Sequence, residues 1–318
     1  MKKLSVGILG FGTVGGGTYE ILTKNHDLIT QRTGVSIDVV KALVRKHREG
    51  IPAHLTTEDP DDILKDPSID VVVETMGGIE PATAFMLQAM ENGKHVVTAN
   101  KAAVAANYEK LQAAAAKNQV QFLFEASVGG GIPVLTAIQN ALQGNAFLEV
   151  MGIVNGTTNY ILTKMTEDGA DYAEVLKDAQ AKGFAEADPT ADVEGIDVAN
   201  KLSILIALLF DQYIPPQDIP TTGISQITGA EIAAAAAEDC KLKLIAHASI
   251  DADGKITASV APEKLPVSHP LAGVSNEFNA VYVTGDMVGE LMFYGKGAGA
   301  LPTGSAVVGD LIGIAKRL

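Results

Sequence analysis

The residues best suited to do chemistry lie in the stretch 182–201, KGFAEADPTADVEGIDVANK. It carries five carboxylates and ends in a lysine at the start of an apolar run, LSILIALLF. The carboxylates are Glu186, Asp188, Asp192, Glu194 and Asp197. Asp197 and Lys201 are four residues apart, so a helix predicted to begin near Val193 places both on one face. This composition predicts a site that binds a positively charged group and has an acid or base beside it.

Lys201 is predicted to be buried, because the apolar run after it leaves no polar face on its helix. A buried lysine must be paired or it readily loses its charge, so Lys201 is a candidate proton donor or acceptor. The carboxylates could hold a metal ion or an ammonium group. A calcium-binding EF-hand loop is excluded, because Val193 stands where that loop requires glycine. We therefore expect an ammonium partner, such as the α-amino group of an amino acid.

A glycine-rich motif near the N-terminus predicts a nucleotide site. A short apolar strand, 4–9, is followed directly by GFGTVG and then by a helical pattern over 18–31. Glycines at this point allow a tight turn and let a pyrophosphate approach the backbone at the helix start. The candidate nucleotide-binding residues are Gly10, Phe11, Gly12, Thr13, Val14 and Gly15.

The basic segment after the second predicted strand, 36–44, indicates which dinucleotide binds. In an NAD site an acidic residue at this strand end would bind the ribose hydroxyl. Here Arg45 and Lys46 take that place, followed by His47 and Arg48. Arg45 is placed to meet a 2′-phosphate, which a carboxylate would repel. NADP is therefore favoured, and NAD remains possible.

Strands and helices continue to alternate after this segment. Strands are predicted at 70–74, 95–98 and 120–125, and helices at 81–92 and 101–118. This rhythm predicts an α/β fold with a doubly wound parallel sheet of the Rossmann type, whose ligands bind beyond the carboxyl ends of the strands. The loops at those ends add Thr75, Gly77 and Lys101 to the candidate cofactor-binding residues.

The pattern changes in the second half of the chain. A strand at 147–154 leads into NGTTNY, which opens a helix whose free N–H groups suit a substrate carboxylate, at Gly156 and Thr157. Hairpins at 241–260 and 278–294 indicate an α+β domain whose mixed sheet contains antiparallel pairs.

Two domains are expected from the length of 318 residues. Residues 1–134 form the expected NADP-binding domain. The chain is expected to return to it through a second glycine-rich loop and a C-terminal helix, 300–318. Residues 135–299 form the expected substrate-binding, catalytic and dimerisation domain.

The overall composition argues against several classes of protein. A net charge of −14 argues against nucleic acid as a partner. The single cysteine, Cys240, fits a reducing compartment, and no apolar run approaches the roughly 20 residues needed to cross a membrane. We therefore expect a cytoplasmic protein that acts neither on a membrane nor on nucleic acid.

The segment 125–133, EASVGGGIP, allows two interpretations. Its three successive glycines expose backbone carbonyls and Glu125 adds a charge, a combination that suits a hard cation. The same residues would also serve as a hinge between domains, and taken alone they favour the hinge.

Six motifs occur in order over essentially the whole chain: GFGTVG, TANKA, FEASVGGGIP, NGTTNYIL, AEADPTADVEGIDVANK and GKGAGALPTGS. Taken together, they resemble those of homoserine dehydrogenases, which interconvert L-homoserine and L-aspartate 4-semialdehyde with a nicotinamide cofactor. The resemblance implies that Lys201 protonates the aldehyde oxygen and that Lys101 is a second acid or base. It also implies that Glu186, Asp192 and Asp197 bind the substrate.

The resemblance extends to the cation, the cofactor and the assembly. It shifts the interpretation of the glycine segment toward a sodium site, formed mainly by backbone carbonyls, at Glu125, Val128, Gly130 and Ile132. Gly183 and Gly299 match positions that touch the cofactor. The family forms dimers or tetramers through its central sheet, so a homodimer is expected. Many bacterial relatives continue into an ACT-type regulatory domain, whereas this chain stops at Leu318, so no threonine inhibition through such a domain is expected.

Two alternative functions remain open from the sequence. One is another amino-acid dehydrogenase on the same fold, for example one that acts on aspartate. The other is a non-catalytic NADP-binding sensor. The residues do not decide which of the two lysines transfers the proton.

Overall fold

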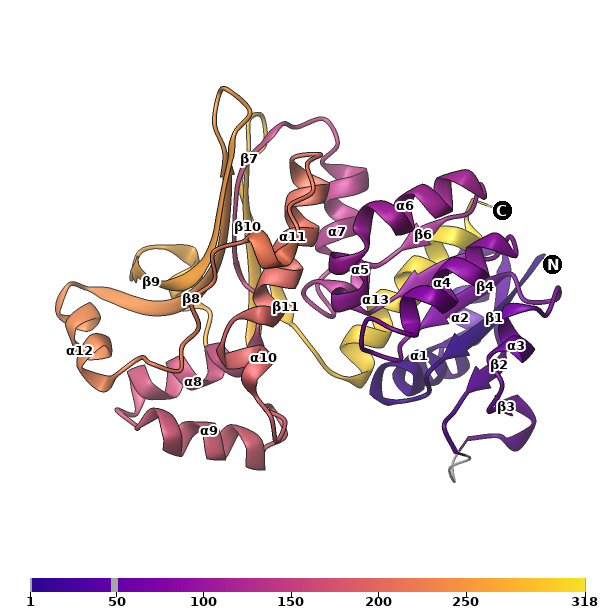
Figure 1. The fold of residues 1–318 in the computed structure, drawn as a ribbon, viewed down its shortest axis with the longest axis horizontal. Helices are drawn as coiled ribbons and strands as arrows, with labels where there is room; N and C mark the ends of the chain where they lie inside the picture. Colours follow the sequence, from indigo (N-terminus) through magenta and orange to yellow (C-terminus); the bar gives the residue numbers. More distant parts are fainter. Residues whose placement is uncertain (1, 47–50, 318) are drawn as a thin grey trace. The chain divides into compact units, whose positions relative to one another are not determined.

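The protein folds as two compact units in the computed structural model, which describes residues 2–46 and 51–317. The first unit consists of Met1–Gly131 with Ala298–Leu318, and the second of Ile132–Gly297 (Figure 1). His47, Arg48 and Leu318, which the sequence analysis named, lie outside the described residues. In the part of the chain that is described, no helix is long and apolar enough to cross a membrane.

The first unit is built on a six-stranded sheet in the order β3-β2-β1-β4-β5-β6, and every pairing in it is parallel. The strands are β1 (Lys2–Leu9), β2 (Val35–Leu43), β3 (Thr56–Thr57), β4 (Val71–Glu74), β5 (His95–Thr98) and β6 (Phe122–Leu123). The order reverses between β1 and β4, which is the point where a doubly wound sheet binds its ligand. The predicted fold class of this half is confirmed.

Short polar residues divide two of the predicted helices of the first unit. The helix expected over 18–31 is two helices separated at Asn25, and the one expected over 101–118 is divided at Asn107. Neither asparagine has helical backbone angles. The Asn107 side-chain amide also bonds locally to the backbone, since it donates to the Ala103 carbonyl oxygen at 3.4 Å. The helices of this unit are α1 (Thr13–Lys24), α2 (His26–Thr33), α3 (Asp61–Leu64), α4 (Ala82–Glu91), α5 (Lys101–Ala106), α6 (Tyr108–Lys117) and α13 (Ala300–Ala315), with 3₁₀ turns η1 (Ala53–Leu55) and η2 (Glu125–Ser127).

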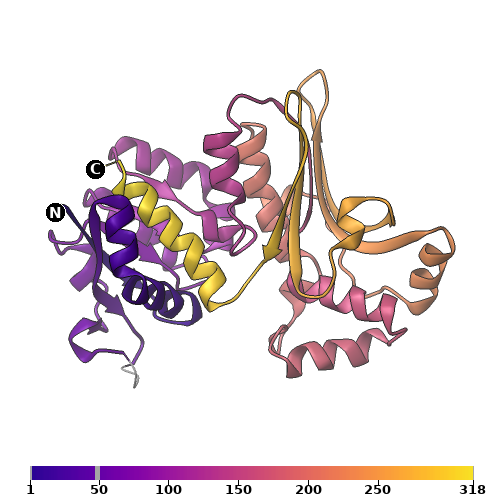
Figure 2. The same ribbon diagram turned by 180° about the vertical axis from the view of Figure 1, so that it is seen from behind.

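The C-terminal helix α13 packs against α1 and completes the core of the first unit (Figure 2). Val307, Leu311 and Ile314 are fully buried and belong to the same apolar cluster as the strands β1 and β4. The two helices approach closely because both lack side chains at the contact. A Cβ on Gly17 would collide with the Ala300 backbone, and one on Gly304 would lie 2.8 Å from Gly17.

The second unit is built on a five-stranded sheet in the order β11-β10-β7-β8-β9. Its strands are β7 (Phe147–Ile153), β8 (Cys240–Ile250), β9 (Ile256–Pro266), β10 (Phe278–Gly285) and β11 (Gly289–Lys296). They all pair antiparallel, whereas a mixed sheet was expected. The short turns after β8 and β10 force antiparallel neighbours, and parallel pairing is seen at an isolated bridge between Thr221 and Val260.

The helix that carries Asp197 and Lys201 is α11 (Ile196–Leu209), which begins three residues later than expected. Gly195 takes a φ of 80°, which lies in the left-handed region and separates α11 from the short helix before it. The other helices of this unit are α7 (Val134–Thr136), α8 (Gly156–Glu167), α9 (Tyr172–Ala181), α10 (Thr190–Val193) and α12 (Gly229–Ala237), with a π-helical turn η3 (Ala137–Ala141) and 3₁₀ turns η4 (Pro216–Asp218) and η5 (Pro270–Gly273).

Candidate functional site

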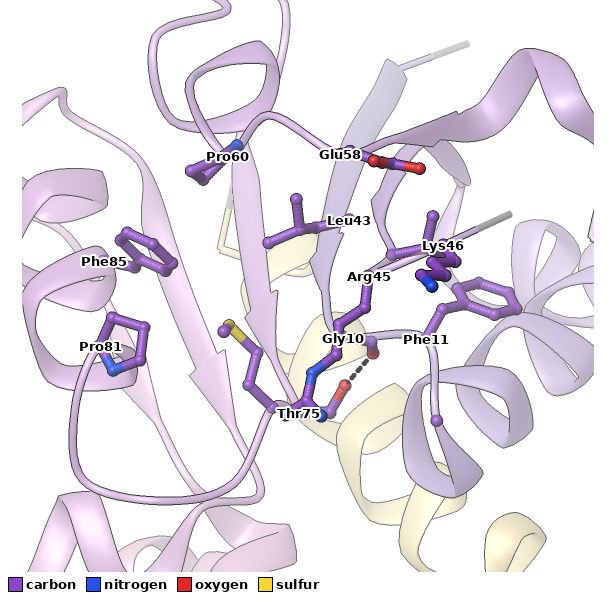
Figure 3. Close-up of a pocket in the computed structure, with 13 residues that line it drawn as sticks. Gly10, Phe11, Leu43, Arg45, Lys46, Glu58, Pro60, Thr75, Pro81 and Phe85 are labelled. Atoms are coloured by element: carbon purple, nitrogen blue, oxygen red, sulfur yellow. Dashed lines mark hydrogen bonds between the residues drawn. The ribbon is translucent and has the colours of Figure 1, made fainter. Parts of the chain in front are cut away.

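A cavity of about 480 Å³ lies at the carboxyl ends of β1, β2 and β4 in the first unit (Figure 3). Gly10, Phe11 and Gly12 of the GFGTVG motif, the end of β2 and the loop after β4 contribute to it, so the structure brings together predicted cofactor residues from three parts of the chain. Thr13, Val14, Gly15, Gly77 and Lys101 are not among the lining residues. Its lining residues are Gly10, Phe11, Gly12, Leu43, Val44, Arg45, Lys46, Glu58, Pro60, Thr75, Met76, Pro81 and Phe85. Glu58, Met76, Pro81 and Phe85 were not singled out from the sequence, because a cavity wall carries no motif.

The glycine turn is held tightly against the loop after β4. Gly10 has a φ of 93°, and a Cβ on Gly15 would collide with the Gly10 carbonyl oxygen. The Thr75 hydroxyl donates a hydrogen bond to that same oxygen at 2.6 Å, drawn as a dashed line in Figure 3. Thr13 and Val14 begin α1, so the free N–H groups of its first turn lie directly after the turn. This arrangement is the one a bound pyrophosphate requires.

Two cations and one carboxylate line the cavity beyond the end of β2. Arg45 and Lys46 follow the strand, and Glu58 comes from the segment after β3 (Figure 3). Because no acidic residue ends β2, this part of the cavity suits a phosphate better than a free ribose hydroxyl.

The ends of β4 and β5 carry a buried polar network. Glu74, which is fully buried, accepts hydrogen bonds from the Thr98 hydroxyl (2.6 Å) and the Met76 N–H (2.7 Å). Burial raises the pKa of its carboxyl above the usual value. Lys101 is the first residue of α5, directly after the capping residue Asn100. Glu74 was missed at the sequence level, although a charge that ends the strand VVVE is a usable signal.

In the second unit the structure joins Lys201 to Asp197. The Lys201 ammonium donates to Asp197 Oδ2 at 2.6 Å and to the Val154 carbonyl oxygen at 2.6 Å. Both side chains are buried, with 10% and 6% of their areas exposed. A paired, buried ammonium of this kind is well placed to exchange a proton with a bound molecule.

Asn155 connects this pair to the start of α8. Its side-chain oxygen accepts from the Thr158 N–H at 2.9 Å and so caps the helix. Its amide nitrogen donates to Asp192 Oδ1 (2.7 Å) and to Asp197 Oδ2 (2.9 Å). The structure therefore brings together two of the predicted substrate carboxylates and the predicted carboxylate-binding helix end at Gly156. Asn155 was not among the predicted site residues, although an asparagine before GTT is an N-cap signal.

The remaining predicted substrate residues lie on or beside the segment 183–187, which follows α9. Thr157 donates its hydroxyl to the Phe184 carbonyl oxygen at 2.6 Å, so this hydroxyl fixes the segment. Gly183 has a φ of 76°, and Glu186 presents an exposed carboxylate while its backbone oxygen accepts from Gln180.

Gly299, another predicted cofactor position, lies in the first unit and caps α13 with a φ of 124°.

The segment predicted to hold sodium contains a buried carboxylate next to a second one. Glu125 is 4% exposed, and its N–H donates to Asp310 Oδ2 of α13 at 2.9 Å. Burial and the charge of Glu125 raise the pKa of Asp310 to about 8. Val128 and Gly130 belong to this unit, whereas Ile132 is the first residue of the second. Within the described ranges no group of three or more His, Cys, Asp or Glu side chains could hold a metal, so backbone carbonyls would supply most ligands.

A doubly wound sheet with a cavity at its switch point, in a chain whose other unit buries a lysine–carboxylate pair, is typical of a nicotinamide-dependent oxidoreductase. Comparison with known proteins gives the family. Residues 10–125 match the family model of the homoserine dehydrogenase NAD binding domain, and residues 133–312 match that of homoserine dehydrogenase. The chain belongs to the homoserine dehydrogenase family.

Individual relatives agree with the family models. A homoserine dehydrogenase of Bacillus subtilis is 46% identical, over 100% of this chain and 74% of its own length. A crystal structure of a homoserine dehydrogenase from Thiobacillus denitrificans has a TM-score of 0.96 at 44% identity, over 99% of this chain and 74% of that one. A hyperthermophilic archaeal homoserine dehydrogenase in complex with NADPH has a TM-score of 0.84 at 27% identity, over 99% and 98%.

The reaction and the cofactor class follow from this membership. The enzyme acts on a CH–OH group and interconverts L-homoserine and L-aspartate 4-semialdehyde, a step in amino-acid biosynthesis. It uses a nicotinamide cofactor. The function predicted from the sequence is confirmed at this level.

Proposed function

We propose that this homoserine dehydrogenase prefers NADP, holds L-homoserine in its second unit and transfers the hydroxyl proton through a lysine. The observation that carries the proposal is the buried contact of Lys201 with Asp197 and with the Val154 carbonyl oxygen. These two acceptors fix the orientation of the Lys201 ammonium within its buried surroundings. That geometry favours acid–base catalysis over a purely structural ion pair.

The substrate ammonium is assigned to the carboxylate cluster. Asn155 orients both Asp192 and Asp197, so their oxygens form a preorganised acceptor pair. Glu186 adds an exposed carboxylate on the segment after α9. The substrate carboxylate is assigned to the first N–H groups of α8, at Gly156 and Thr157, because this helix end favours an anion.

The proton is assigned to Lys201, with Lys101 as a second acid or base. A nicotinamide cofactor, when bound, would supply the hydride chemistry at the carbon that carries the oxygen. In the reducing direction Lys201 donates a proton to that oxygen as the alcohol forms, and in the oxidising direction it removes the same proton. In both directions Asp197 holds the side chain of Lys201 in place through its hydrogen bond to Nζ.

The cofactor is assigned to the cavity of the first unit. The glycine turn and the start of α1 would bind the pyrophosphate, and Thr75 and Gly77 line the strand ends beyond it. Arg45 and Lys46 would bind the 2′-phosphate, which favours NADP. Gly183 and Gly299 are further proposed cofactor positions.

A sodium ion and a homodimer complete the proposal. Burial beside Glu125 disfavours the charged form of Asp310, and a cation held near the Val128 and Gly130 carbonyls would favour that form. The dimer is expected through the sheet of the second unit. The single cysteine, Cys240, supports a reducing compartment such as the cytoplasm.

The experiment that tests the proposal is steady-state oxidation of L-homoserine with NADP and with NAD side by side. We expect turnover with a lower KM for NADP, and Arg45→Ala should raise the KM for NADP about tenfold with little effect on NAD. Arg32→Ala, at the end of α2 and outside the cavity lining, is the matched control. If the KM values for NADP and NAD were equal and Arg45→Ala changed neither, the assignment of the 2′-phosphate to Arg45 would be wrong. If the enzyme oxidised aspartate and not homoserine, the assignment of L-homoserine as the substrate would be wrong.

A further inference from the structure

The most unusual group in the first unit that the mechanism leaves unused is the carboxylate of Glu74. It ends β4, whose other three residues are Val71, Val72 and Val73, and its side chain is 0% exposed. Desolvation of a carboxylate is costly, and it raises the pKa of Glu74 even though several hydrogen bonds act in the opposite direction. An apolar residue would fill this position at lower cost, so the hydrogen bonds of the Glu74 carboxylate indicate what the charge is for.

Glu74 contacts the loops after two neighbouring strands. Its Oε2 accepts from the Thr98 hydroxyl at 2.6 Å, at the end of β5. Its Oε1 accepts from the Met76 N–H at 2.7 Å, in the loop after β4, and more weakly from Asn100 Nδ2 at 3.4 Å. One carboxylate therefore fixes the backbone beyond both strand ends.

Asn100, the residue directly before Lys101, extends the network to the start of α5. Its Nδ2 donates to the Gly78 carbonyl oxygen at 2.6 Å, which ties it to the far end of the loop after β4. Its Oδ1 accepts from the Ala103 N–H at 3.1 Å and caps α5, and its own N–H donates to Thr98 Oγ1 at 3.0 Å. The direction of the first turn of α5, which begins at Lys101, thus depends on groups that Glu74 holds.

The network borders the nucleotide cavity directly. Thr75 and Met76, on either side of the N–H that Glu74 binds, both line the cavity, and Thr75 is bonded to Gly10. In a doubly wound sheet the first three strands bind the adenosine half of a dinucleotide, and β4 to β6 bind the other half. Glu74 therefore lies under the half of the sheet to which the nicotinamide belongs.

We infer that Glu74 is a positioning residue, whose buried carboxylate fixes the loop Thr75–Gly78 and the start of α5 so that Lys101 is held in its working orientation. The inference rests on the proposed acid–base role of Lys101. Misplacement of a reacting group by about 1 Å can lower a rate by up to about 100-fold, so a partial loss of this network should be visible in turnover.

Glu74→Gln is the informative change, because it keeps the shape of the side chain but leaves one acceptor oxygen for the Thr98 hydroxyl and the Met76 N–H. We expect kcat at saturating substrates to fall about tenfold and the deuterium isotope effect on hydride transfer to increase. We also expect faster amide hydrogen exchange, confined to residues 75–79 and 100–104. Asp70→Asn is the matched control, since Asp70 bonds the Ser5 N–H at the opposite end of β4 and should change none of these quantities.

A double-mutant cycle with Lys101→Met decides whether Glu74 acts through Lys101. We expect Glu74→Gln to cost about tenfold in the wild-type background and close to nothing in the Lys101→Met background. An equal loss in both backgrounds, or a wild-type kcat and isotope effect in Glu74→Gln, would overturn the inference. Exchange that rises throughout the sheet would also overturn it, because that result indicates a purely structural role. If the wild type fails to oxidise homoserine, the proposed function fails, whereas exchange in the two loops still reports on the network.

Discussion

At the scale of single residues, the proposed chemistry of this enzyme depends on a few side chains that hydrogen bonds within the protein hold in place. Lys201 is held by Asp197 and by a backbone carbonyl, and Asp197 is in turn held by Asn155. Asn155 also caps α8, so the proposed acid, its carboxylate partner and the proposed anion-binding helix end are fixed by one amide. A change at any of them is expected to alter the others.

Replacement of Lys201 by methionine tests the residue-scale mechanism. Lys201→Met keeps the length of the side chain and removes the proton, so kcat should fall by about 10²- to 10⁴-fold while the dissociation constant for NADPH changes little. Lys164→Met removes a lysine of α8 that is 29% exposed and paired with Asp168, and it should keep the wild-type kcat. The measurement is steady-state turnover together with cofactor binding, each below the unfolding temperature of the variant. Full turnover in Lys201→Met would assign the proton to another group.

The sequence identified the residues with distinctive spacing and missed those that act by supporting them. Asp197, Lys201 and the glycine turn stand in motifs and could be named in advance. Asn155 and Glu74 carry only weak local signals, an N-cap position and a charge that ends a strand, and their roles depend on which distant groups surround them. Asp310 carries no such signal. The contact of the Thr157 hydroxyl could not be predicted for the same reason, since its partner is the distant Phe184 carbonyl oxygen.

At the scale of elements, single residues decided where the helices begin and end. Hydrophobic periodicity predicted helices across Asn25 and Asn107, because one non-helical residue barely disturbs a pattern with a period of 3.6. The strand expected over 120–125 is reduced to Phe122–Leu123, and Glu125 begins a 3₁₀ turn instead. The apolar residues at 120–125 fit a long strand as well as a short one, so only the pairing with β5 decides where the strand begins and ends.

One contact between elements makes a pH-dependent prediction. Lys243 of β8 is 3% exposed, and its ammonium donates to the Val274 carbonyl oxygen (2.7 Å) and to Asn159 Oδ1 of α8 (3.1 Å). Burial lowers its pKa from 10.5 to about 8. Between these values the unfolded chain binds more protons than the folded one, so this group makes stability rise with pH across that window.

Lys243→Met should remove that dependence. The difference in free energy of unfolding between the variant and the wild type should shift by about 2–3 kcal/mol in favour of the wild type as the pH rises from about 7 to about 10. The measurement is urea unfolding of both proteins over this range. Lys264→Met, at an exposed lysine on the neighbouring strand β9, is the control and should show a nearly constant difference. A constant difference for Lys243→Met would mean that its ammonium titrates normally.

At the scale of the whole molecule, alternation along the chain was enough to predict the parallel sheet but not the second one. In the first unit, the parallel neighbours β1–β2, β4–β5 and β5–β6 are each joined by a strand–helix–strand crossover, which alternation along the chain predicts. In the second unit, β7 pairs with β8 across about ninety intervening residues and with β10 across more. No local signal fixes such partners, whereas the two hairpins, which were predicted, need only a short turn.

The five-stranded sheet of the second unit is the surface through which the homodimer is expected to form. A cross-strand row of Met292, Tyr282, Met151 and His247 runs over one face, and Met292 at its edge is 42% exposed. If this face forms the proposed homodimer interface, Met292→Glu would bury an unpaired carboxylate there. Such a charge costs about 3 kcal/mol or more, which would raise the dimer dissociation constant at least about 100-fold.

Light scattering over a dilution series separates the outcomes. The wild type should have the mass of a dimer, and Met292→Glu should dissociate at concentrations where the wild type does not. Met287→Glu makes the same exchange in the turn between β10 and β11, where the side chain is 81% exposed, and should leave the mass unchanged. Because both variants add one negative charge to the same hairpin, a difference between them reports contact at the face and not net charge. A wild-type mass for Met292→Glu would move the interface away from this row.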